Sequence, residues 1–280
     1  MERFEARALE ANWINGWLAA LGVALLLPSV RLRWSDHPMP RAIFESQSPL
    51  VPTLEEVFPT PEEIAALSNA RTLPGTDGEV ARNVTVVQFA ARSRVARRTG
   101  DAGLSSTVTD LHNVESEGCD HSPFDPPAPA GHTVWTRLVA CRRALVVTEA
   151  SLNDSLTGVG RRVKANGLGF DHRRLLPASD PRGDNWVDPV VEVLAFCGLT
   201  MLPIRGDGVR SHARGWTGRP TVVGSFRWPI WTDPLTAPAI DALLDLYWSG
   251  RWDPPGAYES VPYQSRGSSD VTRAYAARRV

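Results

Sequence analysis

An uninterrupted apolar run over residues 17–27 is the feature that most constrains how this chain can fold. Apolar side chains recur through it at helical spacing and Pro28 follows, so the run predicts a helix that ends before this proline. The members of the stripe are Ile14, Leu18, Leu21 and Leu25. Gly16 and Gly22 each cost about 1 kcal/mol inside a helix, which makes sense if another backbone packs closely there.

The same run is too short for a membrane span, and the segment before it is too acidic for a secretory signal. A spanning helix needs about 20 apolar residues, and this run has 11. Three glutamates outnumber two arginines in the first ten residues, and no small-x-small cleavage site follows the run. The three cysteines form no CxxC pair and fit a reducing compartment. We therefore expect a cytoplasmic protein without a membrane anchor.

A period-two pattern predicts two paired strands directly after this helix. Val30, Leu32 and Trp34 alternate with polar residues, which is typical of a half-buried strand. Residues 41–46 are expected to form its partner. The chain should therefore begin with a helix that is followed by two strands.

Further elements are expected along the rest of the chain. Thr60 and Glu63 have the spacing of a capping box around Pro61, which predicts that a helix begins there. The remaining predictions are a short strand in residues 104–111, one long helix from Thr133 to about Leu156, a second buried helix within residues 188–206, a hairpin within residues 209–231 and a helix within residues 233–250.

Helices and strands do not alternate regularly in this order, which favours an α+β fold over a doubly wound sheet. We expect several helices packed on small antiparallel sheets. A weak pseudo-symmetry between the N- and C-terminal helix-plus-strand-pair blocks stays open. Residues 1–260 are expected to form a single domain, with a sub-boundary in the proline-rich loop 118–131 as an alternative. Residues 261–280 are expected to be a loosely ordered tail.

Basic side chains gather in two segments of a chain whose net charge is only -1. Residues 82–98 carry five arginines and no acid, and in a helix three of these arginines share one face. The second segment is rich in glycine, which would let a backbone approach a phosphodiester closely. The expected nucleic-acid contacts are Arg92, Arg94, Arg97, Arg98, Arg161, Arg162 and Lys164. A solvated charged face is the alternative for each cluster.

One segment rich in Asp and His is a candidate for metal-dependent hydrolysis, because carboxylate and imidazole groups can hold a divalent ion. Its members are Asp110, His112, Asp120 and His121. Their spacing matches no ligand pattern, and the segment is expected to be a loop. Solvent-facing polar side chains are therefore the favoured interpretation, and we predict no metal site and no cofactor.

Several enzyme classes lack their motifs in this sequence. There is no GxxxxGK[ST] phosphate loop, no GxSxG elbow and no HExxH, so a P-loop ATPase is excluded. The chain has 10 tryptophans, whose rings could stack bases or anchor protein interfaces, although packing in the core is the favoured role. Those near the C-terminus are Trp216, Trp228, Trp231, Trp248 and Trp252.

Six phrases along the chain carry a family resemblance. They are NGWLAALGVALLLPSVRLRW (15–34), LSSTVTDL (104–111), HSPFDPPAPAGHTVW (121–135), NGLGFDHRRL (166–175), VDPVVEVLAFCGLTMLPIRG (187–206) and GSFRWPIWTDPL (224–235). Together they resemble the CRISPR-associated proteins of the type I-G (formerly I-U) system. The similarity is to the extension protein that accompanies, or is fused to, the helicase-nuclease. The opening and closing phrases are also similar to large-subunit-like effector proteins.

The resemblance implies a role in RNA-guided antiviral defence, where base pairing reads the sequence and proteins hold the backbone. It transfers no catalytic residue to this chain. The leading hypothesis is a non-catalytic effector subunit or adaptor that binds guide RNA, target DNA, the helicase-nuclease or several of these. One alternative is a metal-dependent nuclease that uses Asp110, Asp120 and His121. Another is a protein interaction module anchored by tryptophans.

Overall fold

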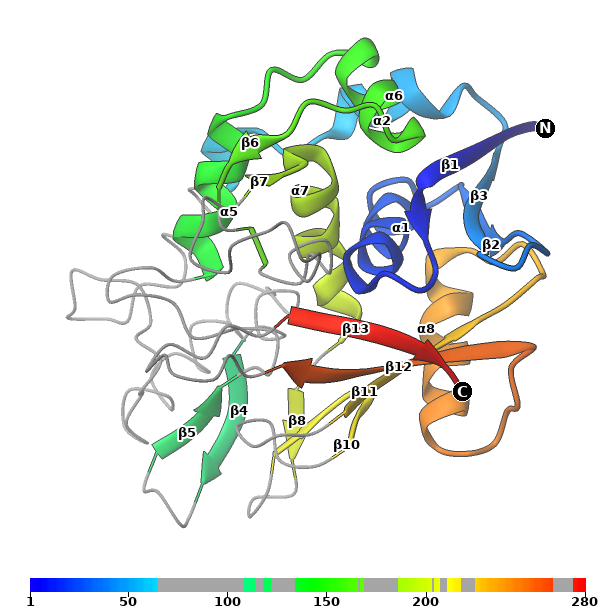
Figure 1. The fold of residues 1–280 in the computed structure, drawn as a ribbon, viewed down its shortest axis with the longest axis vertical. Coiled ribbons are helices and arrows are strands. Elements are labelled where there is room, and N and C mark those ends of the chain that lie inside the picture. The colour runs from blue at the N-terminus through cyan, green and yellow to red at the C-terminus, as the bar shows by residue number, and fades with distance from the viewer. Residues whose placement is uncertain are drawn as a thin grey trace.

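The computed structural model describes residues 1–64, 108–113, 118–121, 134–165, 167–168, 186–202, 204–206, 211–217, 225–263 and 274–280. In these residues helices lie beside antiparallel sheets of three and four strands and three small strand pairs (Figure 1). This arrangement confirms the expected α+β class. The pseudo-symmetry is not confirmed, and the division into one domain stays a prediction.

Two buried helices, α1 (Ile14–Leu26) and α7 (Pro189–Gly198), pack against each other in the core. A Cβ atom on Gly22 would lie 2.0 Å from the Leu194 carbonyl oxygen. A Cβ atom on Gly198 would lie 2.0 Å from the Leu18 carbonyl oxygen. The predicted helix before Pro28, the predicted second buried helix and the close backbone approach at Gly22 are therefore confirmed.

A three-stranded sheet covers the N-terminal region, in the order β1 (Glu2–Glu10), β3 (Arg41–Ser46) and β2 (Arg31–Trp34). The predicted pair β2–β3 is confirmed, and its strands are antiparallel. The expected order of helix, strand, strand missed β1. Phe4, Ala6 and Ala8 alternate with Glu5 and Arg7, but the register of β1 shifts between Ala6 and Glu10, so the alternation is short.

The four-stranded sheet has the order β10 (Trp216–Thr217), β11 (Ser225–Ile230), β12 (Gly256–Tyr263) and β13 (Ala274–Arg279). The predicted hairpin is confirmed by the antiparallel β10–β11 pair, and the predicted last helix by α8 (Ala237–Trp248). The loosely ordered tail is wrong where the structure describes it. Residues 274–279 pair antiparallel with β12 as strand β13.

Shorter helices complete the described part of the chain: α2 (Leu50–Val57), α5 (Val134–Arg143) and α6 (Glu149–Thr157). The single long helix predicted over residues 133–156 is wrong, because α5 ends before a linker and α6 begins at a capping box of Thr148 with Ser151. The predicted capping box at Thr60 is confirmed. The Glu63 N–H donates to Thr60 Oγ1 at 3.1 Å, and the Thr60 N–H donates to Glu63 Oε2 at 2.8 Å.

Three strand pairs stand apart from the larger sheets: β4 (Val108–Asn113) with β5 (Gly118–His121), β6 (Val163–Lys164) with β7 (Trp186–Val187), and β8 (Ile204–Gly206) with β9 (Ser211–Ala213). The strand predicted over residues 104–111 overlaps β4.

Indole groups connect the N-terminal elements to the C-terminal sheet. Trp17 Nε1 donates to the Pro229 carbonyl at 3.1 Å, and Trp228 Nε1 donates to the Ala11 carbonyl at 2.7 Å. Trp231 Nε1 donates to the Leu32 carbonyl at 2.8 Å. Since these rings are buried, the core role expected for the tryptophans is confirmed for Trp228 and Trp231.

Candidate nucleic-acid interface

The second basic cluster lies on the segment that joins α6 to β6. The helix ends at Gly158, whose φ of 96° lies in the left-handed region that favours glycine. The backbone N–H groups of Gly158 and Val159 donate to the Asp154 carbonyl at 3.0 and 2.8 Å. These bonds fix the direction in which the chain leaves α6, and Arg161 follows directly on this exit.

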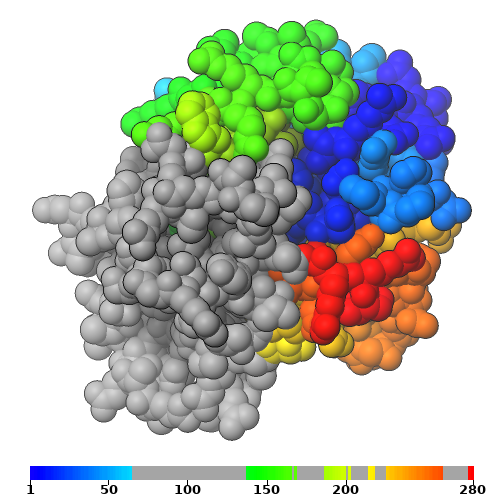
Figure 2. All heavy atoms as spheres, viewed as in Figure 1, coloured from blue at the N-terminus to red at the C-terminus, as the bar shows by residue number. Residues whose placement is uncertain are grey.

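The β6–β7 ladder carries the end of the cluster. Lys164 is the register partner of Trp186, and Val163 is the partner of Val187. Val187 is only 1% exposed and anchors the ladder in the core, whereas Trp186 is 52% exposed. Directly paired residues present their side chains on the same face of a ladder, so Lys164 and Trp186 share an exposed face. In Figure 2 the green surface of residues 137–165 adjoins the lime surface where β7 leads into α7.

The three basic residues of this cluster differ in what they do. Arg161 and Lys164 are exposed, whereas Arg162 is half-buried. The Arg162 guanidinium donates to the Trp186 carbonyl, which ties the exit from α6 to β7. Arg161 and Lys164 therefore lie at the surface, and Arg162 positions the ladder.

Two glycines of this segment serve packing within the chain. A Cβ atom on Gly160 would lie 2.4 Å from Asp188 Oδ2, and one on Gly167 would lie 2.5 Å from Glu192 Oε2. The space beside these glycines is thus taken by carboxylates, which repel a phosphate. The expectation that they let a phosphodiester approach the backbone is wrong for Gly160 and Gly167.

These two carboxylates are held by donors of the chain itself. Asp188 caps α7 and accepts hydrogen bonds from two backbone N–H groups of its first turn, at 3.0 and 3.3 Å. Glu192 is 2% exposed and accepts from Asn15 Nδ2 and from the Leu168 N–H, each at 2.7 Å. These hydrogen bonds join α1, α7 and the glycine-rich segment. They fix α7, which directly follows strand β7 of the ladder.

The two cysteines whose side chains the structure describes, Cys141 and Cys197, are protonated thiols, and the first is influenced by the Glu192 carboxylate. Burial, and then the Glu192 carboxylate, raise the pKa of Cys141 to about 12. Burial also raises the pKa of Cys197 to about 12. A thiolate nucleophile is therefore strongly disfavoured at neutral pH at either position.

The other predicted contact residues, Arg92, Arg94, Arg97 and Arg98, lie outside the residues that the structure describes.

The candidate metal segment forms the β4–β5 hairpin, so the expectation of a loop is wrong there. Asp110 and His112 lie on β4, while Asp120 and His121 lie on β5, and the two strands pair in the register His112 with Cys119 and Val108 with His121. The structure describes the backbone of this hairpin and not its side chains. Among the described side chains, no group of three His, Cys, Asp or Glu could hold a metal ion.

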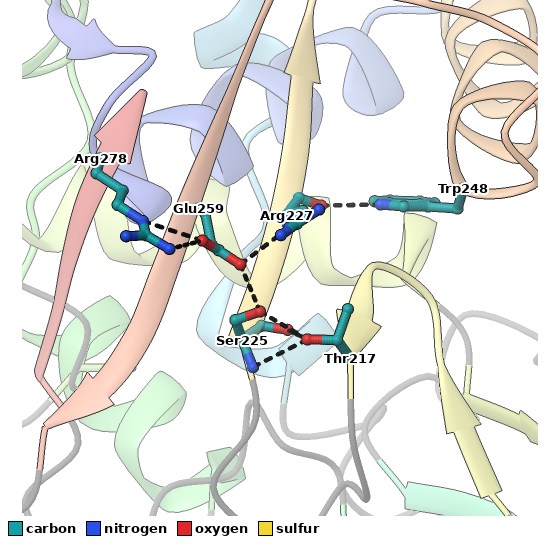
Figure 3. A network of polar contacts seen from close by, with 6 residues as sticks. All are labelled: Thr217, Ser225, Arg227, Trp248, Glu259 and Arg278. Atoms are coloured by element: carbon teal, nitrogen blue, oxygen red, sulfur yellow. Dashed lines mark hydrogen bonds and ion pairs between the residues drawn. The ribbon is translucent and has the colours of Figure 1, made fainter. Parts of the chain in front are cut away.

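A second charged cluster lies on the four-stranded sheet (Figure 3). Glu259 on β12 is 3% exposed and accepts from Ser225 Oγ at 2.8 Å and Arg227 Nε at 2.9 Å on β11. It also accepts from Arg278 Nη2 on β13 at 2.6 Å. The hydrogen bonds from Arg278, Ser225 and Arg227 lower the pKa of Glu259 to about 2. Because one carboxylate serves two guanidinium groups, the cluster fastens three strands together.

Sequence reasoning did not single out Trp186 as a site residue. A two-residue ladder has no periodicity that could reveal it. One local feature could have drawn attention to Trp186. It lies in the sequence Asp-Asn-Trp-Val-Asp-Pro, two positions before a residue that caps a helix. The tryptophans that did attract attention are buried, as for Trp228 and Trp231, or half-buried, as for Trp216.

Comparison with protein-family models, curated proteins and solved structures finds no match to this chain. In the part of the chain that the structure describes, every helix is too short or too polar to cross a membrane.

Proposed function

We propose that this protein is a non-catalytic subunit or adaptor of a type I-G CRISPR effector that acts in the cytoplasm. It binds the backbone of guide RNA or target DNA, and it associates with effector subunits and the helicase-nuclease. The family resemblance of the six phrases supports the biological setting. The exposed pair Arg161 and Lys164 on a braced ladder is the observation that carries nucleic-acid binding.

The physical basis is electrostatic. Cations on a surface neutralise phosphates and release counterions, so the binding falls steeply as salt rises. An arginine adds a planar group that can bind a phosphate through two hydrogen bonds. Both side chains project from backbone that is fixed by the Gly158 turn and by the bond from Arg162 to β7.

A charge-reversal experiment tests this proposal. The variant Arg161→Glu with Lys164→Glu should bind single- and double-stranded DNA and RNA at least about tenfold more weakly than the wild type at low salt. The matched control reverses two other exposed arginines, Arg7→Glu with Arg251→Glu. If both variants bind like the wild type, the cluster is a solvated surface and the proposal for it falls.

Co-purification tests the partners. Native protein should bring down effector subunits, and nuclease treatment should release those that are held through nucleic acid. The protein interaction module would be favoured instead if the protein binds no nucleic acid and its partners stay bound after nuclease treatment.

A metal-dependent nuclease is the second candidate, and one observation favours it. Asp110 lies on β4, and Asp120 and His121 lie on the strand that pairs with β4, so the backbone brings the three positions to one hairpin. Labelled substrates incubated with Mg²⁺ or Mn²⁺ should be cut by the wild type and not by Asp120→Ala. Absence of cutting, or cutting that survives this substitution, removes the nuclease candidate.

A further inference from the structure

We infer that Trp186 is a stacking platform for an unpaired base, so that the surface formed by Arg161, Lys164 and Trp186 selects single-stranded nucleic acid over duplex. This inference deepens the proposed function and rests on it. Nothing in the roles of Arg161 and Lys164 alone requires it, because cations bind the phosphates of both forms.

The exposure of Trp186 is the first argument. Tryptophan normally buries a large apolar area, yet this ring is 52% exposed, while Trp17, Trp34 and Trp228 are 0 to 1% exposed. The adjacent residue Val187 supplies the core contact of the ladder, so the indole of Trp186 is not needed for that packing.

The position of the ring relative to charge is the second argument. Trp186 and Lys164 are register partners and share one face of the β6–β7 pair. Arg161 lies two residues before β6 and is exposed as well. An aromatic ring beside cations is the combination that binds single strands, because the ring stacks a base while the cations hold the adjacent phosphates.

The rigidity of the backbone is the third argument. The Arg162 guanidinium bonds to the carbonyl of Trp186, and Asp188, two residues further on, is fixed as the cap of α7. The backbone that carries the ring is thus restrained at Trp186 and two residues after it before any ligand arrives. Preorganisation of this kind lowers the entropy that binding would otherwise cost.

The test compares Trp186→Ala, Trp186→Phe and Val159→Ala, where Val159 is an exposed apolar residue of the same segment. Binding to labelled strands of about 15 nucleotides, and to duplexes of the same sequence, is followed by fluorescence anisotropy. Trp186→Ala should lose about tenfold in affinity for single strands and leave the duplex affinity unchanged, because paired bases are not free to stack. Trp186→Phe should retain most of the affinity, and Val159→Ala all of it.

Intrinsic fluorescence gives a second reading. A stacked base quenches indole emission, so wild-type emission should fall on adding unlabelled single strands, and this fall should be smaller in Trp186→Phe. If Trp186→Ala binds single strands like the wild type, or loses single-strand and duplex affinity equally, the inference is overturned. If Arg161→Glu with Lys164→Glu weakens binding at the same time, the proposed function stands without it. If the wild type binds neither form, both fall.

Discussion

At the scale of single residues, the carboxylate charge of Glu259 stabilises the four-stranded sheet. Its carboxylate is nearly buried and accepts hydrogen bonds from Ser225, Arg227 and Arg278, on the two strands beside its own. Hydrogen bonds to charged groups are stronger than those between neutral groups. Arg227 and Arg278 are therefore engaged in structural contacts within this sheet.

The substitution Glu259→Gln should lower the free energy of unfolding by about 1 to 3 kcal/mol at neutral pH, because the charged partner of two guanidinium groups is lost. The control is Glu56→Gln on the exposed side of α2, which should change the stability by less than about 0.5 kcal/mol. Urea unfolding of the three proteins measures both values.

The same residue predicts a pH dependence. The pKa of Glu259 is lowered from 4.5 to about 2, so the folded state favours the ionised carboxylate. Its contribution to stability is complete above pH 4.5 and is lost as the pH falls toward about 2. The difference in unfolding free energy between wild type and Glu259→Gln should shrink across this range. A difference that stays constant down to the acid end would contradict the assigned hydrogen bonds.

We expect the thiols of Cys141 and Cys197 to react slowly with thiol reagents. Because the pKa of Cys141 and of Cys197 is raised to about 12, few thiolates form in the folded protein. In the variant Cys119→Ser, a thiol reagent at about pH 8, where an ordinary cysteine reacts readily, should modify neither residue until denaturant is added. Rapid modification of a thiol in the native variant would show that one of the two sites opens to solvent.

At the scale of elements, the pair α1 and α7 is the part of the core with the least room for change. A methyl group on Gly22 or Gly198 would collide with a backbone carbonyl of the other helix, which cannot move aside as a flexible side chain can. A glycine inside a helix costs about 1 kcal/mol relative to alanine, and this close contact between the two backbones explains why one is present at each position.

The substitutions Gly22→Ala and Gly198→Ala should each lower the unfolding free energy by about 1 to 3 kcal/mol or more, despite the higher helix propensity of alanine. The control is Gly256→Ala, whose added Cβ would lie 3.1 Å from the mobile end of the Ile230 side chain. Thermal unfolding should show a clearly larger loss for the two helix variants. Equal losses would mean that the helix contact at Gly22 and Gly198 is no tighter than the contact at Gly256.

Elements with strong local patterns could be predicted from the sequence. The stripe around Leu18, the alternation around Leu32 and the capping box at Thr60 each fix an element through neighbouring residues. Strand β1 has only a short alternation before its register shift, and β13 is specified by its pairing with β12 rather than by a local pattern. The break between α5 and α6 was missed because Thr148 interrupts a run that is otherwise helical in pattern.

The candidate site could also be predicted from the sequence only in part. The basic residues Arg161, Arg162 and Lys164 are visible in the sequence as a charge run, but their different exposure is not. The pairing of Lys164 with Trp186 joins positions 22 residues apart, through a ladder of only two residues per strand. Such a contact is fixed by tertiary packing, which no local pattern reports.

At the scale of the whole molecule, indole hydrogen bonds tie the N-terminal helix and sheet to the C-terminal sheet. Trp34 and Trp231 also meet edge to face, with ring centroids 6.2 Å apart. Trp228 and Trp231 are thus buried in the core, whereas Trp186 is 52% exposed. The basic ladder at β6–β7 lies on the surface above this core, so changes there should alter binding without unfolding the protein.

The salt dependence of binding tests the central claim most directly. For single strands, log affinity falls with log salt by about 0.7 for each phosphate contact. The neutral variant Arg161→Gln with Lys164→Gln should therefore reduce the slope of the wild type by about 1.4, as expected for two lost contacts. The control Arg7→Gln with Arg251→Gln should keep the wild-type slope. An unchanged slope and affinity in the Arg161 and Lys164 variant would contradict the claim that this ladder binds nucleic acid.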